Sequence, residues 1–377
     1  ALAFVLPIST AGVSIISVLI LIFWLAERDF SRKFEQIKSS PVAISILAFL
    51  LLHFLGFLWL DVESINPFKS FLLLLVPIVL TSVKKEYVPK IFGSFIAAMT
   101  ISEILVYKNI LLNYEKLSTI DPSDFMPFLS HITYNPFLAF AISVLIIIGV
   151  NQKTDSKYKY IVWFFVSSMI INMFLTGGRA GQIALLVCLS ILIVYYFWNK
   201  KIIMLSFGSL MPIVLLFMYF INPVFQNRLN QAVGDVTTFD QNRDTSVGAR
   251  LQWTINSIEL IKEKPLIGHG TGSFEKNYER IHNKLTPNFI MAANPHNNYI
   301  LVLVQFGIVG LLVFLSIFYT QIRSFVRTPS SFEYKPLKLI LPVMFMVICL
   351  SDTYLWGHHT QALFALFSGI LYSEEVI

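Results

Sequence analysis

Charge is scarce in this chain. Only 13% of its 377 residues are charged, whereas 56% are hydrophobic and 34 are phenylalanine. Soluble globular domains carry about 25% charged residues, so this composition excludes a set of soluble domains and indicates a polytopic membrane protein. The formal net charge is +6, but the basic residues fall in short loops between apolar runs. We therefore expect no nucleic-acid partner.

Cysteine and clustered carboxylates are also scarce. The two cysteines, Cys188 and Cys349, each lie inside an apolar run, which predicts neither a disulfide framework nor a cysteine metal site. The long polar segment contains no Asp-x-Asp pattern, so we expect no divalent cation on a phosphate group, and no cofactor. The chain begins in an apolar stretch without a charged flank, and no cleavable signal peptide is expected.

What the chain does have is a series of apolar runs typical of an all-α membrane protein. They predict 11 or 12 transmembrane helices, and a break at residues 7–10, inside the first run, favours 12. Residues 1–221 and 299–377 then form an N-terminal and a C-terminal set of helices. The runs are 1–25, 42–60, 68–83, 91–106, 136–150, 161–176, 182–198, 202–221, 299–322, 337–350 and 361–372.

Loop charge predicts the orientation of these helices. Alternate loops carry sixteen Lys and Arg on one side and three in the short loops on the other. The positive-inside rule places the basic loops in the cytoplasm. Residues 177–181 and the 77-residue polar segment 222–298 then lie on the outer face of the membrane.

Residues 222–298 are predicted to fold as a partly helical cap. Ile255, Ile258 and Ile261 follow one another at helical spacing within 254–264, and charged residues fill the opposite side until Pro265. This pattern predicts a short amphipathic helix. We expect it to lie on the membrane surface or to pack as a lid over the helical bundle.

Two arginines and a histidine are the candidate functional residues. Arg179 is the only basic residue in its turn, beside Gly177 and Gly178, which suits an anionic head group better than a simple membrane anchor. Arg250 follows Gly248-Ala249 and resembles other solvated loop arginines when taken alone. A guanidinium fork grips phosphate oxygens bidentately, so a pair of arginines can hold a diphosphate.

His296 ends the cap, where the chain re-enters the membrane. A neutral imidazole can take a proton from a sugar hydroxyl, although lone histidines are more often structural. Asn297 and Asn298 can orient the ring, bind sugar hydroxyls, or cap the helix beginning at Tyr299. Asp352, after the 337–350 run, is expected to pair with a basic residue of the cap or site.

Other polar patterns carry weaker signals. The glycine-rich residues 268–272 follow no strand and lack the P-loop lysine, so they predict a tight turn of the cap. His358 and His359 are adjacent rather than at metal-ligand spacing. His53 and Glu103 are functional candidates because they lie within membrane runs, although they form no chain suggestive of a proton relay.

The order of these motifs resembles the O-antigen ligase family, whose superfamily includes the O-antigen polymerases. A Gly-Gly-Arg-Ala-Gly turn, Val-Gly-Ala-Arg-Leu, Pro-Leu-Ile-Gly-His-Gly-Thr-Gly-Ser-Phe and Pro-His-Asn-Asn-Tyr follow one another, before Gln-Phe-Gly-Ile-Val-Gly-Leu at 305–311. The resemblance covers about residues 170–320. It departs from the pattern at Asn-Pro-His-Asn, where some relatives carry a second histidine.

The resemblance implies a GT-C-like, inverting, metal-independent glycosyltransferase of the Gram-negative inner membrane, with its active site facing the periplasm. Its donor would be a glycan on undecaprenyl diphosphate, its acceptor lipid A-core, and membrane lipids its surroundings. His296 would be the general base, and Arg179 and Arg250 would hold the diphosphate; Asn297 and Asn298 would bind substrate. The alternatives are an O-antigen polymerase and, disfavoured by the large cap, a transporter of lipid-linked sugars.

Overall fold

A computed structural model of the chain describes residues 1–60, 62–63, 69–113, 125–151, 157–200, 202, 216, 219–220, 223–237, 239, 243–374 and 376. Every regular element within these ranges is a helix. The elements are α1 Leu2–Val5, α2 Thr10–Ala26, α3 Phe30–Ser39, α4 Pro41–Leu55, η1 Gly56–Trp59, η2 Phe71–Leu74, α5 Leu75–Ser82, η3 Lys85–Tyr87, α6 Val88–Leu112, α7 His131–Asn151, α8 Lys157–Leu175, α9 Arg179–Phe197, α11 Pro223–Thr237, α12 Ser246–Glu263, α13 Phe274–Leu285, α14 Asn298–Arg327, α15 Leu337–Ile348 and α16 His358–Leu371.

Six of the described helices are long and apolar enough to cross a membrane, or seven if the bent pair α2 and α3 is one span. Two more apolar helices, Phe71–Ser82 and Leu337–Ile348, are shorter. The protein is therefore an all-α, multi-pass membrane protein, as the composition predicts. The predicted span 202–221 lies almost wholly outside the described residues, and the number twelve stays a prediction.

The predicted break in the first apolar run is present. The short helix α1 ends at Val5, and Ser9 starts α2 by accepting a hydrogen bond from the Gly12 amide on its side-chain oxygen. This is ordinary N-capping by serine. The first run is thus two helices rather than one.

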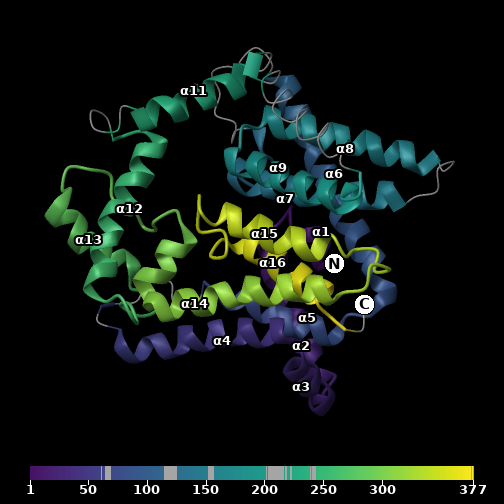
Figure 1. The fold of residues 1–377 in the computed structure, drawn as a ribbon, viewed down its shortest axis with the longest axis horizontal. Coiled ribbons are helices and arrows are strands. Elements are labelled where there is room, and N and C mark those ends of the chain that lie inside the picture. Colours follow the sequence, from purple (N-terminus) through teal and green to yellow (C-terminus); the bar gives the residue numbers. More distant parts are fainter. Residues whose placement is uncertain are drawn as a thin grey trace.

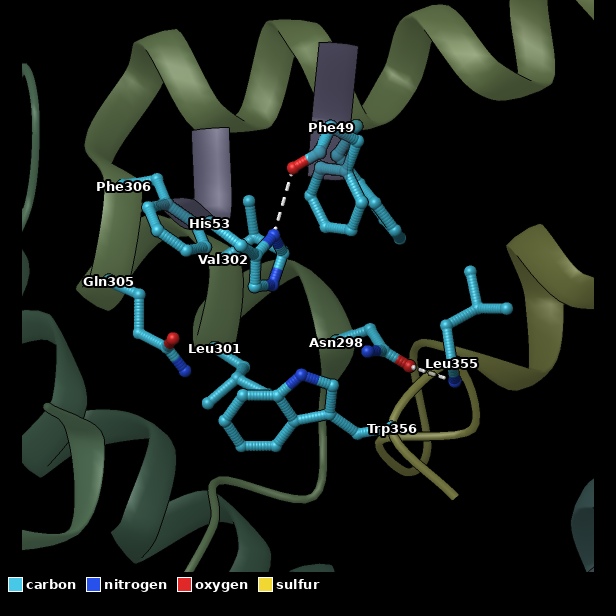
Figure 2. A pocket seen from close by; sticks show the side chains of 10 residues that line it. Phe49, His53, Asn298, Leu301, Val302, Gln305, Phe306, Leu355 and Trp356 are labelled. Carbon is cyan, nitrogen blue, oxygen red and sulfur yellow. Dashed lines mark hydrogen bonds between the residues drawn. The ribbon is translucent and has the colours of Figure 1, made fainter. Parts of the chain in front are cut away.

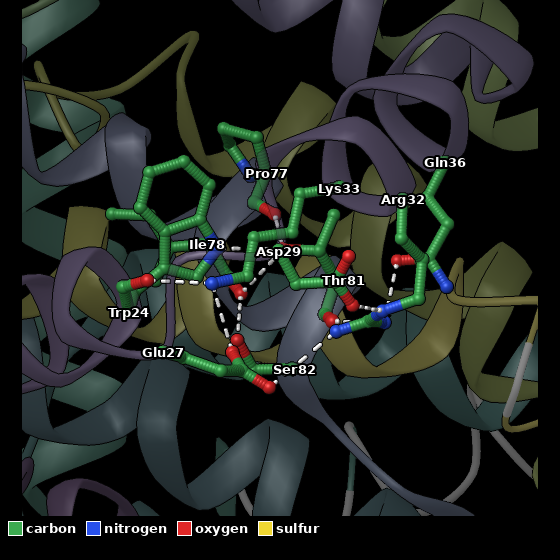
Figure 3. Close-up of polar contacts among 10 residues, drawn as sticks. All are labelled: Trp24, Glu27, Asp29, Arg32, Lys33, Gln36, Pro77, Ile78, Thr81 and Ser82. Carbon is green, nitrogen blue, oxygen red and sulfur yellow. Dashed lines mark hydrogen bonds and ion pairs between the residues drawn. The ribbon is translucent and has the colours of Figure 1, made fainter.

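A sharp corner follows α2, where α3 turns away by 115°. Arg28 and Asp29 adopt positive φ angles there. Lys33 is 1% exposed at its side chain, yet its Nζ is satisfied by the Trp24 carbonyl at 2.5 Å and by Glu27 Oε2 at 2.9 Å (Figure 3). A buried ammonium needs such partners, so these contacts fix the corner.

The membrane helices pack in layers around α7, α15 and α16. Figure 1 shows α15 and α16 (yellow) between a layer holding α4 and α14 and a layer holding α8 and α9. Stacked and edge-on aromatic rings fill the interior, among them Phe92, Phe140 and Phe367, which are fully buried. Large aromatic side chains bury much apolar area in defined geometries, which explains the use of so much phenylalanine.

The helices α11, α12 and α13 form the cap at one end of the bundle (Figure 1, green). A second hydrophobic core joins the cap to α14, with Leu260 and Tyr278 on the cap side and Leu301 and Val304 on the α14 side. The predicted amphipathic helix exists and ends before Pro265, but it begins at Ser246. Because side chains of the cap and of α14 pack in one hydrophobic core, the cap is a folded part of the molecule.

The apolar face of α12 differs from the prediction. The helix buries Asn256, Ser257 and Leu260, whereas Ile255 and Ile258 are exposed. Burial of the two polar side chains is compensated, because Asn256 Nδ2 donates to Thr286 Oγ1 at 2.8 Å and Ser257 Oγ to the Trp253 carbonyl at 2.7 Å. The exposed isoleucines fit the predicted contact with lipid, which stays a prediction.

The glycine-rich residues 268–272 form the predicted turn, and they lock the cap into a break in α14. At Gly307, α14 has φ 61° and ψ −158° and loses its helical hydrogen bonds. The cap replaces them. The His269 and Gly270 amides donate to the carbonyls of residues 304 and 305 at 2.9 and 2.8 Å, and the amides of residues 308 and 309 donate to the carbonyls of residues 265 and 266 at 2.9 and 3.2 Å. We call this exchange the interlock.

His53 connects the same region to the C-terminal loop. Its Nδ1 lies 2.9 Å from the Phe49 carbonyl and its Nε2 lies 3.0 Å from Ser70 Oγ, while Trp356 Nε1 donates to the same hydroxyl at 3.2 Å. The ring borders a cavity of about 10 Å³ (Figure 2), which is room for about one water molecule. Both ring nitrogens are engaged, which supports a structural role for His53.

Candidate active site

His296 lies in the turn that leads from the cap into α14. Its φ is 48°, in the left-handed region that residues other than glycine seldom adopt. The Asn294 side chain stabilises this conformation, because its Oδ1 accepts a hydrogen bond from the His296 amide at 2.9 Å. Strained backbone of this kind gathers at functional sites.

Asp352 pairs with His296, as the sequence suggested it would pair with a basic group. Its Oδ1 lies 3.1 Å from His296 Nδ1 and accepts the Thr353 amide at 2.7 Å. Burial alone raises the pKa of Asp352. The hydrogen bond and charge of His296, the Thr353 amide and the charge of Arg250 outweigh burial, and the pKa lies below its usual value.

The pairing fixes the tautomer of His296. An ionised carboxylate only accepts hydrogen bonds, so Nδ1 of the ring carries the hydrogen that faces Asp352. In the neutral ring Nε2 then holds the lone pair. Among the described residues no side chain or backbone group hydrogen-bonds to Nε2, and the imidazole is 29% exposed. The geometry presents a proton-accepting nitrogen to a ligand.

Helix α12 brings Arg250 to the same place. Arg250 is half-buried, and its charge acts on Asp352. Trp253, three residues along and hence on the same helical face, stacks on the His296 ring with centroids 4.9 Å apart and planes at 27°. Sequence reasoning missed Trp253. The helix predicted from the sequence began at residue 254, so it included neither Trp253 nor Arg250.

Arg179 begins α9 after a tight turn. Gly177 has φ 68°, and a Cβ on Gly178 would overlap the side chain of Asn135, near the start of α7. Thr176 Oγ1 also donates to Asn135 Oδ1 at 2.9 Å. The glycines are therefore required for close packing on α7, in addition to any ligand contact.

The start of α7 also receives the loop that holds Asp352. Tyr354 Oη donates to the Ile132 carbonyl at 3.2 Å, one turn from the residue that supports the Arg179 turn. The Arg179 turn and the Asp352–His296 pair thus lie at the same end of the bundle, each supported by the first turn of α7. The structure brings Arg250 and His296 together around Asp352, and joins Arg179 to them through α7.

Asn297 and Asn298 serve the architecture. Asn297 caps α14 with its Oδ1, which accepts from the Tyr299 amide at 2.9 Å, and its Nδ2 donates to the Leu350 carbonyl at 3.1 Å. Asn298 is buried, and its Oδ1 accepts the Leu355 amide at 3.0 Å. The capping alternative is confirmed for Asn297 and is wrong for Asn298, which is the first residue of α14. A contact of either residue with a sugar stays a prediction.

The remaining intramembrane candidates hold helices together. His359 Nε2 lies 2.8 Å from Thr10 Oγ1 and His358 Nε2 lies 3.0 Å from Ser14 Oγ, which joins α16 to α2. Glu103 in α6 accepts a hydrogen bond from Ser168 of α8 at 2.6 Å. These contacts are distant in sequence and place none of the three side chains beside His296.

Residues 164–315 match the family model described as O-antigen ligase. Over that segment the chain is similar to the O-antigen ligase family. The segment matched by the family model contains Arg179, Arg250 and His296, and it also contains the interlock. Asp352, which pairs with His296, lies beyond it.

A protein of Haemophilus influenzae, named only as an uncharacterized protein, is 27% identical to this chain over 281 residues. The alignment covers 70% of this chain and 66% of the relative, just under two thirds. The relative's name assigns no activity. The identity of the donor and acceptor must therefore be argued from the site.

Proposed function

We propose that this protein is an O-antigen ligase that transfers a glycan from a polyprenyl diphosphate to a sugar hydroxyl of lipid A-core. The observation that carries the proposal is the His296–Asp352 pair at 3.1 Å, with Nε2 open and a guanidinium nearby. A buried acid, an oriented imidazole and a cation suit proton abstraction beside a phosphate leaving group.

The proposed reaction is a single displacement. His296 Nε2 takes the proton from the acceptor hydroxyl while that oxygen attacks the anomeric carbon of the donor. A glycosidic bond forms on the side opposite the breaking bond to the diphosphate, which leaves with the electron pair, so the configuration inverts. Asp352 stabilises the imidazolium that results. General-base catalysis of this kind contributes about 10²–10⁴-fold to the rate.

Arg250 and Arg179 are proposed to hold the diphosphate. Each guanidinium offers a planar fork that matches phosphate oxygens and stays charged at all relevant pH values. Charge develops on the diphosphate as the bond breaks, and a preorganised cation stabilises that charge more than the bound ground state. Arg250 arrives from the cap and Arg179 from the bundle, so the donor would bridge the two parts.

The identity of the substrates rests on the family and on loop charge. The donor is proposed to be a glycan on undecaprenyl diphosphate, and the acceptor lipid A-core, in the Gram-negative inner membrane. The positive-inside bias supports a periplasmic location for the cap, residues 222–298. The cap would then connect the N-terminal set of helices, residues 1–221, to the C-terminal set, residues 299–377. Exposed Ile255 and Ile258 on α12 support a cap that contacts lipid.

Reconstituted transfer tests the proposal. Purified protein in lipid vesicles is given a glycan on undecaprenyl diphosphate and lipid A-core, and new core-linked glycan is measured. Wild type should form it, and His296→Ala should lose about 10²-fold or more while keeping its melting temperature. Near-normal transfer by His296→Ala would remove His296 as the base. A lipid-linked sugar transporter would form no glycosidic bond.

A deletion strain separates ligase from polymerase. If the protein is a ligase, the strain should display unsubstituted core and accumulate polymer on the lipid carrier. Core that bears a single repeat unit would instead show that the missing activity is polymerisation. In either case, a plasmid copy of wild type should restore normal lipopolysaccharide to the deletion strain, and a copy of His296→Ala should not.

A further inference from the structure

Trp253 covers one face of the candidate base. Its indole stacks on the His296 ring at a centroid distance of 4.9 Å, with the two planes at 27°. The indole is itself held in place, because Trp253 Nε1 donates to the Ile290 carbonyl at 3.0 Å. Asp352 meets the ring edge at Nδ1. One face and one edge of the imidazole are thus occupied, and Nε2 is left for the acceptor.

The stack has a consequence that depends on charge. The neutral imidazole gains only packing from the indole, but the imidazolium formed by proton transfer is a cation over the face of a tryptophan, the aromatic ring best suited to cation–π attraction. We propose that Trp253 is a positioning residue that fixes the plane of His296 and selectively stabilises its protonated form during glycan transfer. This inference rests on the proposed function.

The other groups around His296 act by charge and can be separated from Trp253. Asp352, on the loop after α15, favours the imidazolium. Arg250, on α12, disfavours it but is coupled to Asp352. Tyr354 lies on the same loop as Asp352 and is neutral until high pH, because burial raises its pKa. Trp253 carries no titratable group, so its replacement leaves these charges in place.

The stack also links the base to the cap. Trp253 comes from α12, whereas His296 belongs to the turn before α14, and the interlock fixes the two segments to each other. Any movement of α12 relative to α14 would slide the indole over the imidazole. The contact between base and indole is therefore complete only when α12 is seated against the turn before α14.

The test compares Trp253→Leu and Trp253→Phe in vesicles, with transfer rates measured across pH. Leucine keeps apolar cover but has no π face, whereas phenylalanine keeps a ring. Losing the π face destabilises the imidazolium, so in Trp253→Leu the acidic limb of the pH–rate profile should move to lower pH by roughly half a unit. Its kcat should fall about tenfold, with KM for the donor nearly unchanged, and Trp253→Phe should recover most of both.

Trp59→Leu is the matched control. Trp59 Nε1 donates to the Ile267 carbonyl at 3.0 Å, so it too anchors a cap carbonyl, but it does not touch His296. The acidic limb of the pH–rate profile of Trp59→Leu should lie at the same pH as that of wild type. An unmoved limb in Trp253→Leu, or an equal shift in Trp59→Leu, would overturn the role of Trp253. Failure of the proposed function looks different, because wild type itself would then form no core-linked glycan.

Discussion

Asp352 Oδ1 and His296 Nδ1 lie 3.1 Å apart although the two residues are 56 positions apart in the chain, with all of α14 and α15 between them. The two helices run out and back, so the turn before α14 and the loop after α15 return to the same end of the bundle. The Asn298 amide reinforces this by donating to the Cys349 carbonyl at 2.9 Å. Helix length and packing, rather than local sequence, thus build the pair.

Asp352→Asn should lower kcat without unfolding the protein. An amide can fill the space of the carboxylate, but it neither enforces the Nδ1–H tautomer nor stabilises the imidazolium. We expect a loss between about tenfold and the full 10²–10⁴-fold contribution of a general base, measured by reconstituted transfer. Glu279→Gln, an exposed cap carboxylate, is the control. Equal rates for Asp352→Asn and wild type would show that His296 acts without Asp352.

The lowered pKa of Asp352 predicts an acid-sensitive contribution to stability. A carboxyl whose folded pKa is depressed stabilises the fold fully above its unfolded pKa, about 4, and loses that contribution as pH falls through the folded value. Asp352→Asn lacks the contribution at every pH. The gap in melting temperature between wild type and this variant should therefore narrow as pH falls below about 4. A gap that stays unchanged as pH falls below about 4 would contradict the assignment.

Arg250→Lys and Arg179→Lys should each lose most transfer, because an ammonium cannot reproduce the bidentate fork. We expect at least about a tenfold fall in kcat/KM for the donor, with melting temperatures close to wild type. Lys262→Arg, at an exposed position paired with Glu259, controls for exchange of one cationic group for the other elsewhere in the cap. Full activity in both lysine variants would remove the proposed grip on the diphosphate.

Sequence patterns predicted the helical class, a break at residues 7–10 and the end of α12 before Pro265. The family resemblance added the candidates His296 and Arg250, whose roles stay predictions. The sequence patterns did not predict the stack of Trp253 on His296. The contact joins residues 43 positions apart on two elements, and periodicity reports only which residues share one face. The buried face of α12 could not be predicted from the sequence either. Asn256 and Ser257 can be buried only because the folded structure supplies hydrogen-bond partners for them.

Only one of the two segments of the interlock could be predicted from the sequence. Its glycines predicted a tight turn, and that turn is present, with positive φ at Gly268, Gly270 and Gly272. What no local pattern indicated is the second partner, the break at Gly307, since the surrounding residues of α14 continue a strong apolar run. The broken helix and the inserted turn satisfy each other's backbone hydrogen-bonding groups. Neither segment could therefore be predicted without the other.

Gly307→Ala should be among the most destabilising glycine substitutions in the chain. Gly307 has φ 61°, and a Cβ there would overlap the Leu266 carbonyl, so both the helix break and the seat of the cap resist it. We expect a loss of about 1–3 kcal/mol or more, seen as a lower melting temperature.

Gly93→Ala is the matched control for that loss. Gly93 lies within α6, and a Cβ there meets nothing within 4 Å; alanine should stabilise the helix by about 0.5–1 kcal/mol. Because the interlock seats the cap that carries Arg250, Gly307→Ala should also reduce transfer below what the fraction of folded protein explains. If transfer per folded molecule matched that of Gly93→Ala, the cap would not depend on the break in α14 for its catalytic position.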